Sequence, residues 1–177
     1  MATSIPTIDH LMQQYKHIIR NDFDRYNNHV YRVFLNCKML DDSIENEEKY
    51  AIAAVFHDIG IWTDHTIDYL NPSIIKAKEY LNEVGKLLWM YEIALMIDMH
   101  HKMSKYNGKY EATVEVFRKA DWMDVSLGLL NFGVNKQFIK ANQKQYKNLG
   151  FHQFLIKATT KNFLQHPFRN PLPMFKK

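Results

Sequence analysis

The sequence predicts an all-α bundle of seven or eight helices. Apolar residues recur at helical spacing along most of its 177 residues, and no segment alternates apolar and polar residues as a half-buried strand does. Six Gly and five Pro are few for a loop-rich β-barrel. Apolar residues make up 46% of the chain and charged residues 24%, which excludes a disordered protein. We therefore expect one domain over residues 1–177, long enough to bury a core.

The first three helices follow from apolar spacing and capping residues. Apolar side chains three and four residues apart predict a helix at about 8–19. The Asn27-Asn28 pair can cap a second helix at 29–40. A third helix is expected at 43–58, with Gly60 as its natural stop.

The rest of the chain reads as five further helices joined by loops. Residues 61–72 are expected to form a loop, and Asn107-Gly108 predicts a turn at 102–109. The proline-containing segment 166–177 is expected to be a surface arm. The remaining helices are expected at 73–84, 86–101, 111–130, 135–147 and 151–165.

Composition limits the classes of function. Cys37 is the single cysteine, which excludes an internal disulfide and a thiolate-only zinc site, whereas nine histidines favour a metal held by His and carboxylate. The net charge of +4 is mild and scattered, so no nucleic acid polymer is expected as a partner. The longest apolar stretch, 87–99, is too short to span a bilayer, and no signal peptide is visible. We expect a cytoplasmic protein without a membrane partner, and a homo-oligomer is compatible with the sequence.

Four polar residues lie at or near helix ends beside apolar neighbours. His29 opens the second predicted helix, His57 and Asp58 close the third, and Asp121 lies within the sixth. A buried polar group without a partner costs roughly 2–7 kcal/mol, and a shared metal ion would give all four a partner. Taken singly, each also fits an ordinary role, such as a core histidine bonded to backbone or an aspartate paired with a basic neighbour.

The order and spacing of these residues resemble the HD-domain superfamily of metal-dependent phosphohydrolases. The resemblance covers about residues 25–125 and leaves the C-terminal helices and arm at 130–177 outside. The strings that carry it are Asn28-His29-Val30-Tyr31-Arg32-Val33, Ala54-Val55-Phe56-His57-Asp58-Ile59-Gly60 and Arg118-Lys119-Ala120-Asp121.

The resemblance implies that His29, His57, Asp58 and Asp121 bind one divalent ion, with Asp58 also taking part in catalysis. Two imidazoles and two carboxylates suit Mn²⁺, Fe²⁺, Co²⁺, Ni²⁺ or Zn²⁺, and the sequence does not choose among them. Such an ion would lower the pKa of a bound water and polarise a phosphoryl oxygen.

A second metal ion is disfavoured because His100-His101 is the one additional histidine cluster between His57 and Asp121. His100 and His101 are expected to line the pocket or contact the substrate. A His-His pair at this position is similar to small HD proteins akin to cyanamide hydratase.

The chain departs from the family pattern just after His-Asp. Many HD nucleotide hydrolases carry an acidic residue there, where this chain has Ile61 and Trp62. Asp64 and Asp68 are the nearest substitutes for proton transfer, and a solvated loop accounts for them equally well.

Arg32 and Lys119 are the candidate phosphate contacts. Arg32 lies three residues after His29, on the same helix face. An internal ion pair of Arg32 with Asp58 or Asp121 is the favoured alternative, because a guanidinium binds carboxylates bidentately.

The leading hypothesis is a metal-dependent phosphohydrolase that cleaves a phosphoester of a small anionic compound or nucleotide. One alternative is a cyanamide-hydratase-like lyase on the same metal centre, with a narrow pocket closed by Trp62, Tyr69 and His100. Another is a non-catalytic binding domain that keeps the ion for stability.

Overall fold

The described part of the chain is helical without strands, which confirms the all-α fold predicted from the sequence. The computed structural model describes residues 4–165, and the arm expected at 166–177 lies outside the described residues. No helix between residues 4 and 165 is long and apolar enough to cross a membrane. The α-helices of this region are α1 (Pro6–Ile19), α2 (Phe23–Leu40), α3 (Ile44–Phe56), α4 (Gly60–Thr63), α5 (Leu70–Glu83), α6 (Met90–Met99), α7 (Glu111–Val125), α8 (Lys136–Gln145) and α9 (Phe151–Gln165), and the 3₁₀ turns are η1 (Arg20–Asp22) and η2 (Leu87–Trp89).

Eight of the nine α-helices in residues 4–165 lie where the sequence predicted helices. The additional one, α4, is a single turn inside the loop expected at 61–72. It forms because the chain keeps turning after α3, with the Ile61 amide donating to the Asp58 carbonyl at 3.0 Å. Gly60 therefore begins α4, whereas we expected it to stop the preceding helix. The extent of the domain, 1–177, stays a prediction.

Helix α2 begins six residues earlier than predicted. It starts at Phe23 because η1 leads directly into it, so the Asn27-Asn28 pair lies inside the helix and the predicted cap is wrong. Asn28 has another role: its Nδ2 donates to the Lys147 backbone oxygen at 2.8 Å. This contact connects the first turns of α2 to the segment that joins α8 and α9.

Two further boundaries differ from the predictions. The apolar segment expected as one helix at 86–101 contains η2 followed by the shorter α6. Helix α7 ends at Val125 and not near residue 130, because Leu127 adopts a left-handed φ of 55°. The Gly128 amide then donates back to the Met123 carbonyl at 2.8 Å, which closes the helix end.

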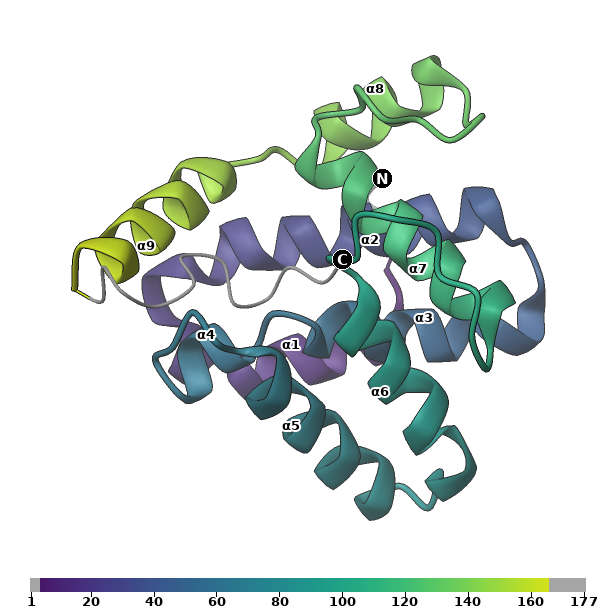
Figure 1. Ribbon diagram of the computed structural model, residues 1–177, viewed down its shortest axis with the longest axis horizontal. Helices are drawn as coiled ribbons and strands as arrows, with labels where there is room; N and C mark the ends of the chain where they lie inside the picture. The colour runs from purple at the N-terminus through teal and green to yellow at the C-terminus, as the bar shows by residue number, and fades with distance from the viewer. Residues whose placement is uncertain (1–3, 166–177) are drawn as a thin grey trace.

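The core is centred on α3 and α2. Every side chain from Tyr50 to Phe56 is at most 1% exposed, so α3 is buried on all faces over its second half. Helix α2 packs against both α3 and α7 and crosses the middle of the molecule (Figure 1). Burial of apolar surface contributes about 25 cal/mol per Å², so the fully buried half of α3 stabilises the fold.

A row of polar side chains lies within this core between α2 and α7. His29, Arg32 and Asn36 are at most 2% exposed. Their spacing of three and four residues places them on one face of α2. Asn36 Nδ2 donates to the Ala120 carbonyl of α7 at 3.1 Å, so this face meets α7.

Close packing of α4 on the start of α5 requires glycine at position 60. A Cβ there would lie 2.6 Å from the Tyr69 carbonyl oxygen, closer than real Cβ atoms approach. The Gly60 amide also donates to Ser73 Oγ at 3.0 Å. These contacts fix the start of α4, which directly follows the turn that contains His57 and Asp58.

Asp41 stabilises the corner between α2 and α3. Its carboxylate accepts hydrogen bonds from the Ser43 amide at 3.0 Å, Asn46 Nδ2 at 2.9 Å and the Tyr50 hydroxyl at 2.6 Å. Burial alone would raise the pKa of Asp41, but these hydrogen bonds outweigh it and lower the pKa to about 2.

We expect Asp41→Asn to lower the free energy of unfolding at pH 7 by about 1–2 kcal/mol, because charge-assisted hydrogen bonds are lost. The depressed pKa means that the stabilisation is present above the unfolded-state value, about 3.9, and is lost as pH falls toward 2. The difference between wild type and variant should therefore shrink below pH 4 in urea denaturation. The exposed neighbour provides the control, Asp42→Asn, and equal effects of the two substitutions would contradict this account.

Candidate metal centre

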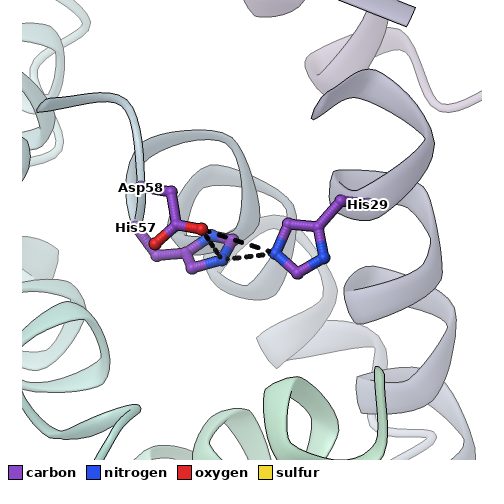
Figure 2. Close-up of side chains that lie close together, drawn as sticks. All are labelled: His29, His57 and Asp58. Carbon is purple, nitrogen blue, oxygen red and sulfur yellow. Dashed lines mark hydrogen bonds and ion pairs between the residues drawn. The ribbon is translucent and has the colours of Figure 1, made fainter. Parts of the chain in front are cut away.

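His29, His57 and Asp58 come together in the buried core (Figure 2). His29 comes from α2, and the other two follow the last turn of α3. The Nε2 atoms of the two histidines are 2.9 Å apart, and Asp58 Oδ2 lies 3.6 Å from His29 Nε2 and 3.4 Å from His57 Nε2. Asp121 of α7 completes the cluster, with Oδ1 at 3.7 and 3.8 Å from the same nitrogens. The structure thus brings the four predicted ligands together, and their binding of an ion stays a prediction.

The hydrogen bonds of the two histidines use Nδ1 of each ring, so that Nε2 of each ring faces the centre. His57 Nδ1 donates to the Ala54 carbonyl at 2.8 Å, and His29 Nδ1 donates to Asp124 Oδ2 at 2.7 Å. Burial, with His29 and His100 nearby, lowers the pKa of His57 to about 3 despite the opposing effect of Asp58, so its imidazole is neutral. His29 Nε2 lies 2.9 Å from His57 Nε2 with two carboxylates beside them, and a cation placed there could be bound by both rings and both carboxylates. The donor set therefore fits a metal ion.

The carboxylates of the cluster also favour a cation. Burial raises the pKa of Asp121 to about 6, although His100 and His29 oppose that rise. Asp58 behaves differently: burial raises its pKa, but His57 and His100 outweigh burial and hold it well below its usual range. A divalent ion would stabilise both carboxylates in their charged form.

Two buried atoms of the centre have no hydrogen-bond partner among the described residues. They are Asp58 Oδ1 and His100 Nε2, which lie 3.6 Å apart. His100 Nδ1 donates to the Ile97 carbonyl at 2.7 Å, so its Nε2 faces the centre. Such atoms cost stability unless a ligand or ion satisfies them. Within the described chain, Asp58 belongs to two groups whose ligand atoms lie within 4.8 Å of one another, one with His29 and His57 and one with His100 and His101.

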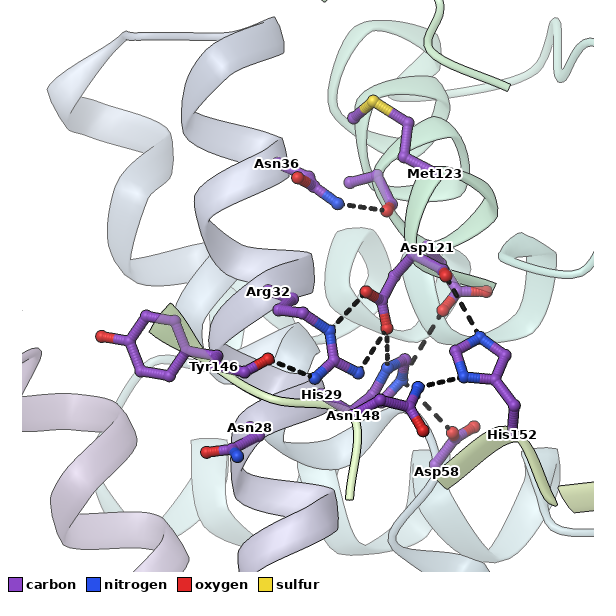
Figure 3. A network of polar contacts seen from close by, with 12 residues as sticks. Asn28, His29, Arg32, Asn36, Asp58, Asp121, Met123, Tyr146, Asn148 and His152 are labelled. Atoms are coloured by element: carbon purple, nitrogen blue, oxygen red, sulfur yellow. Dashed lines mark hydrogen bonds and ion pairs between the residues drawn. The ribbon is translucent and has the colours of Figure 1, made fainter. Parts of the chain in front are cut away.

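Asp124 is the residue that sequence reasoning missed. It accepts bonds from Arg32 Nε at 2.5 Å and Nη2 at 2.9 Å while it holds His29 Nδ1 (Figure 3 shows the surrounding network). Arg32 Nη1 donates to the Tyr146 carbonyl at 2.8 Å. Arg32 is thus committed to an internal pair, as the favoured alternative had it, but its partner is neither Asp58 nor Asp121. The sequence held one indication of this role for Asp124. It lies three residues after Asp121, the same spacing as that of His29 and Arg32 on the facing helix.

The other proposed contacts do not reach the cluster in the described structure. Lys119 lies 3.8 Å from Glu115 with 34% of its side chain exposed. Asp64 and Asp68 are exposed, because α4 takes up residues 60–63 and the following segment runs along the surface. Asp64 accepts a hydrogen bond from Thr63 Oγ1 at 2.7 Å, and no ion pair joins either aspartate to the four described ligands. The structure therefore gives no support to their predicted roles in proton transfer and substrate binding.

Aromatic residues surround the centre. The Tyr69 hydroxyl lies 2.6 Å from His101 Nε2, and His101 Nδ1 lies 3.9 Å from Asp121 Oδ2. Phe151 of α9 stacks on His29 with ring centroids 4.2 Å apart. Trp62 bonds to a residue outside the cluster, because its Nε1 donates to Asp22 Oδ2 at 2.9 Å. Of the residues expected to close a pocket, Tyr69 and His100 therefore face the cluster and Trp62 does not bond to it.

We expect His57→Ala to abolish binding of divalent transition metals, because it removes one of the two facing nitrogens. Purified wild-type protein should retain metal in elemental analysis and gain thermal stability on addition of Mn²⁺ or Zn²⁺. The variant should show neither effect. His17→Ala changes an exposed histidine and should behave like wild type. Equal metal content in all three proteins would exclude this centre.

We expect Asp124→Asn to weaken metal affinity about 10–100-fold, because it removes the carboxylate that orients His29. It should also lower stability by about 3–5 kcal/mol, since Arg32 is left buried without its partner. Glu115→Gln is a matched control, because Glu115 is buried on the same helix and binds Arg118 at 2.6 and 2.7 Å. The control should lose stability and keep its metal affinity in titration calorimetry. A similar loss of affinity in both variants would argue against orientation of His29.

Comparison with known proteins agrees with this centre. A family model described as the HD domain matches residues 26–126, more than half of the chain. No curated protein and no solved structure matches the chain. The matched segment runs from α2 to the end of α7 and contains all four residues of the cluster together with Asp124 and His100. The chain belongs to the HD-domain family.

Proposed function

We propose that this protein is a metal-dependent hydrolase whose ion is held by His29, His57, Asp58 and Asp121. The observation that carries the proposal is the geometry of the cluster: two histidine Nε2 atoms face each other 2.9 Å apart, buried beside two carboxylates. Membership of the HD-domain family supports it, since that family consists in general of metal-dependent hydrolases.

The proposed substrate is a phosphoester of a small anionic compound or nucleotide. A bound divalent ion would supply Lewis-acid activation of water and of the phosphoryl oxygen. The HD-domain match is the support for phosphoester chemistry, because HD domains are typically phosphohydrolases. The same proposal includes one divalent transition metal ion, with a second ion at His100 and His101 as the less favoured alternative.

The protein's own groups have distinct tasks in this proposal. His29 and His57 would bind the ion through Nε2, because Asp124 and the Ala54 carbonyl occupy their Nδ1 atoms. Burial raises the pKa of Tyr69 well above its usual value, so its hydroxyl keeps its proton at neutral pH. With the hydroxyl 2.6 Å from His101, the pair can hold or pass a proton beside Asp121. Tyr69 and His101 therefore take the place in proton transfer that we had assigned to Asp64 and Asp68.

One observation favours a second candidate, a hydratase or lyase acting on a small neutral compound. The cations nearest the motif residues are committed: Arg32 binds Asp124, and Arg118 binds Glu115. A phosphate would therefore depend on the ion for much of its charge neutralisation, whereas a neutral nitrile-like substrate needs no cationic side chain. The aromatic side chains around the centre, Phe151 on His29 and Tyr69 beside His101, are compatible with either substrate.

Assays of the metal-loaded protein decide between these functions. We expect metal-dependent release of phosphate from at least one phosphomonoester or nucleotide, loss of that release in Asp58→Asn, and a decrease in kcat of about 10²-fold or more in Tyr69→Phe if the hydroxyl moves a proton. Exposed Tyr91→Phe is the control for Tyr69→Phe.

Two other outcomes would replace the proposal. Turnover of cyanamide without phosphate release would establish the hydratase. Stabilisation by metal without turnover of either class of substrate would establish a non-catalytic binding domain.

A further inference from the structure

The charges of this protein are divided between two parts of the chain. All 19 acidic residues lie at or before Asp124, together with 14 of the 23 basic residues, so residues 1–124 carry a net charge of −5. Residues 125–177 contain nine Lys or Arg and no acidic residue, a net charge of +9. The overall charge of +4 conceals this division. A cationic segment of this length without a carboxylate indicates an anionic partner.

The described lysines of this segment lie on the surface and outside ion pairs. Lys136, Lys140 and Lys144 follow one another at intervals of four residues, which places them along one face of α8. Lys147 continues the row. All four are exposed, and none forms a salt bridge with a described residue. Several lysines of the first part are paired with carboxylates instead, and Lys38, for example, pairs with Glu47 at 2.8 Å.

Exposed aliphatic side chains lie on the loop that directly precedes this row of lysines, and Gly128 of that loop lies against Ile139 of α8. The loop between α7 and α8 carries Leu127, Leu129 and Leu130, which are 60%, 86% and 46% exposed. Two turns with left-handed residues, at Leu127-Gly128 and Phe132-Gly133, shape the loop directly before Lys136. Burial of these leucines against a partner would be favourable, because the described chain leaves their apolar surface in water.

These residues lie along one edge of the molecule. Helices α8 and α9 and the loop before α8 line the edge that is uppermost in Figure 1, away from α3, α5 and α6. We call Lys136, Lys140, Lys144 and Lys147, together with Leu129 and Leu130, the C-terminal basic surface. Successive lysines on α8 are about 6 Å apart along the helix axis, well within the Debye length of about 8 Å at physiological salt. They therefore act together on a charged surface.

We propose that the C-terminal basic surface binds the face of an anionic lipid bilayer. Lysines attract anionic head groups, and leucines beside them can enter the boundary between head groups and acyl chains. A nucleic acid fits less well, because its binding surfaces are typically rich in Arg and in aromatic rings for stacking. The described basic residues after Asp124 are all lysines, and Phe132 already packs under Arg118 and Lys119.

This proposal is independent of the proposed function and revises one expectation. We expected no membrane partner from the absence of a spanning segment, and binding to a bilayer surface needs no spanning helix. The segment that carries this surface also reaches the metal centre, because Phe151 of α9 stacks on His29 and the Tyr146 carbonyl after α8 accepts from Arg32. A bound bilayer would therefore lie on the α8–α9 side of the centre.

Co-sedimentation of the full chain with lipid vesicles tests the proposal. We expect binding to phosphatidylcholine vesicles that contain about 30% phosphatidylserine, no binding to pure phosphatidylcholine, and release as salt rises from about 0.1 to 0.5 M. Lys140→Glu should weaken binding about tenfold or more, since each lysine near an anionic surface contributes about fivefold. Lys78→Glu on α5 makes the same change of net charge at an exposed lysine without a described ion pair, and it should bind like wild type.

The leucines need a control of their own. Leu129→Ser should weaken binding to the anionic vesicles, whereas Leu88→Ser should not, although Leu88 is 91% exposed. Thermal melting should show that all four variants remain folded, because each replaced side chain is exposed.

Three outcomes would overturn the proposal. The first is absence of binding to phosphatidylserine vesicles at about 0.05 M salt, where the attraction is strongest. The second is an equal effect of Lys140→Glu and Lys78→Glu, which would show a response to net charge alone. The third is a single-stranded oligonucleotide that displaces the protein from vesicles and whose binding depends on Lys140 but not on Leu129, which would assign the surface to nucleic acid.

Discussion

The carboxylate of Asp124 is the contact on which the core and the metal centre both depend. It binds Arg32 with two hydrogen bonds and His29 Nδ1 with a third, all in the buried seam between α2 and α7. A buried guanidinium without this partner would be strongly destabilising. Its Oδ2 atom fixes the ring of His29 so that Nε2 faces His57. The packing of two helices and the orientation of a ligand are therefore one interaction.

The charges around that seam explain why an ion belongs there. Asp58, Asp121 and Asp124 are buried with one guanidinium, that of Arg32, so full ionisation would leave a net charge of −2. The rise of the pKa of Asp121 to about 6, with burial as its main cause, expresses the cost of that excess in a protein core. One divalent ion would cancel this excess negative charge, and it would be bound by the two facing imidazoles. The charge balance and the positions of the donor atoms thus both favour one divalent ion in this centre.

The molecule combines this centre with a segment of different character. The HD-domain match ends at residue 126, and the acidic residues end at Asp124. Beyond that point the chain contributes α8 and α9, which carry unpaired lysines on their surface and cover the His29 side of the centre through Phe151. The part shared with the family contains the candidate ligands, and the part outside the match carries the cationic surface.

The sequence by itself determined the helical class, the approximate positions of eight helices and the order of His29, His57-Asp58 and Asp121, because apolar periodicity and short motifs are local properties. Only the tertiary structure decided which helix faces meet. That decision gave Arg32 to Asp124, set Asp64 and Asp68 on the surface, and stacked Phe151 on a histidine 122 positions earlier in the chain. Such contacts depend on how distant helices pack, and no local pattern of residues encodes that packing.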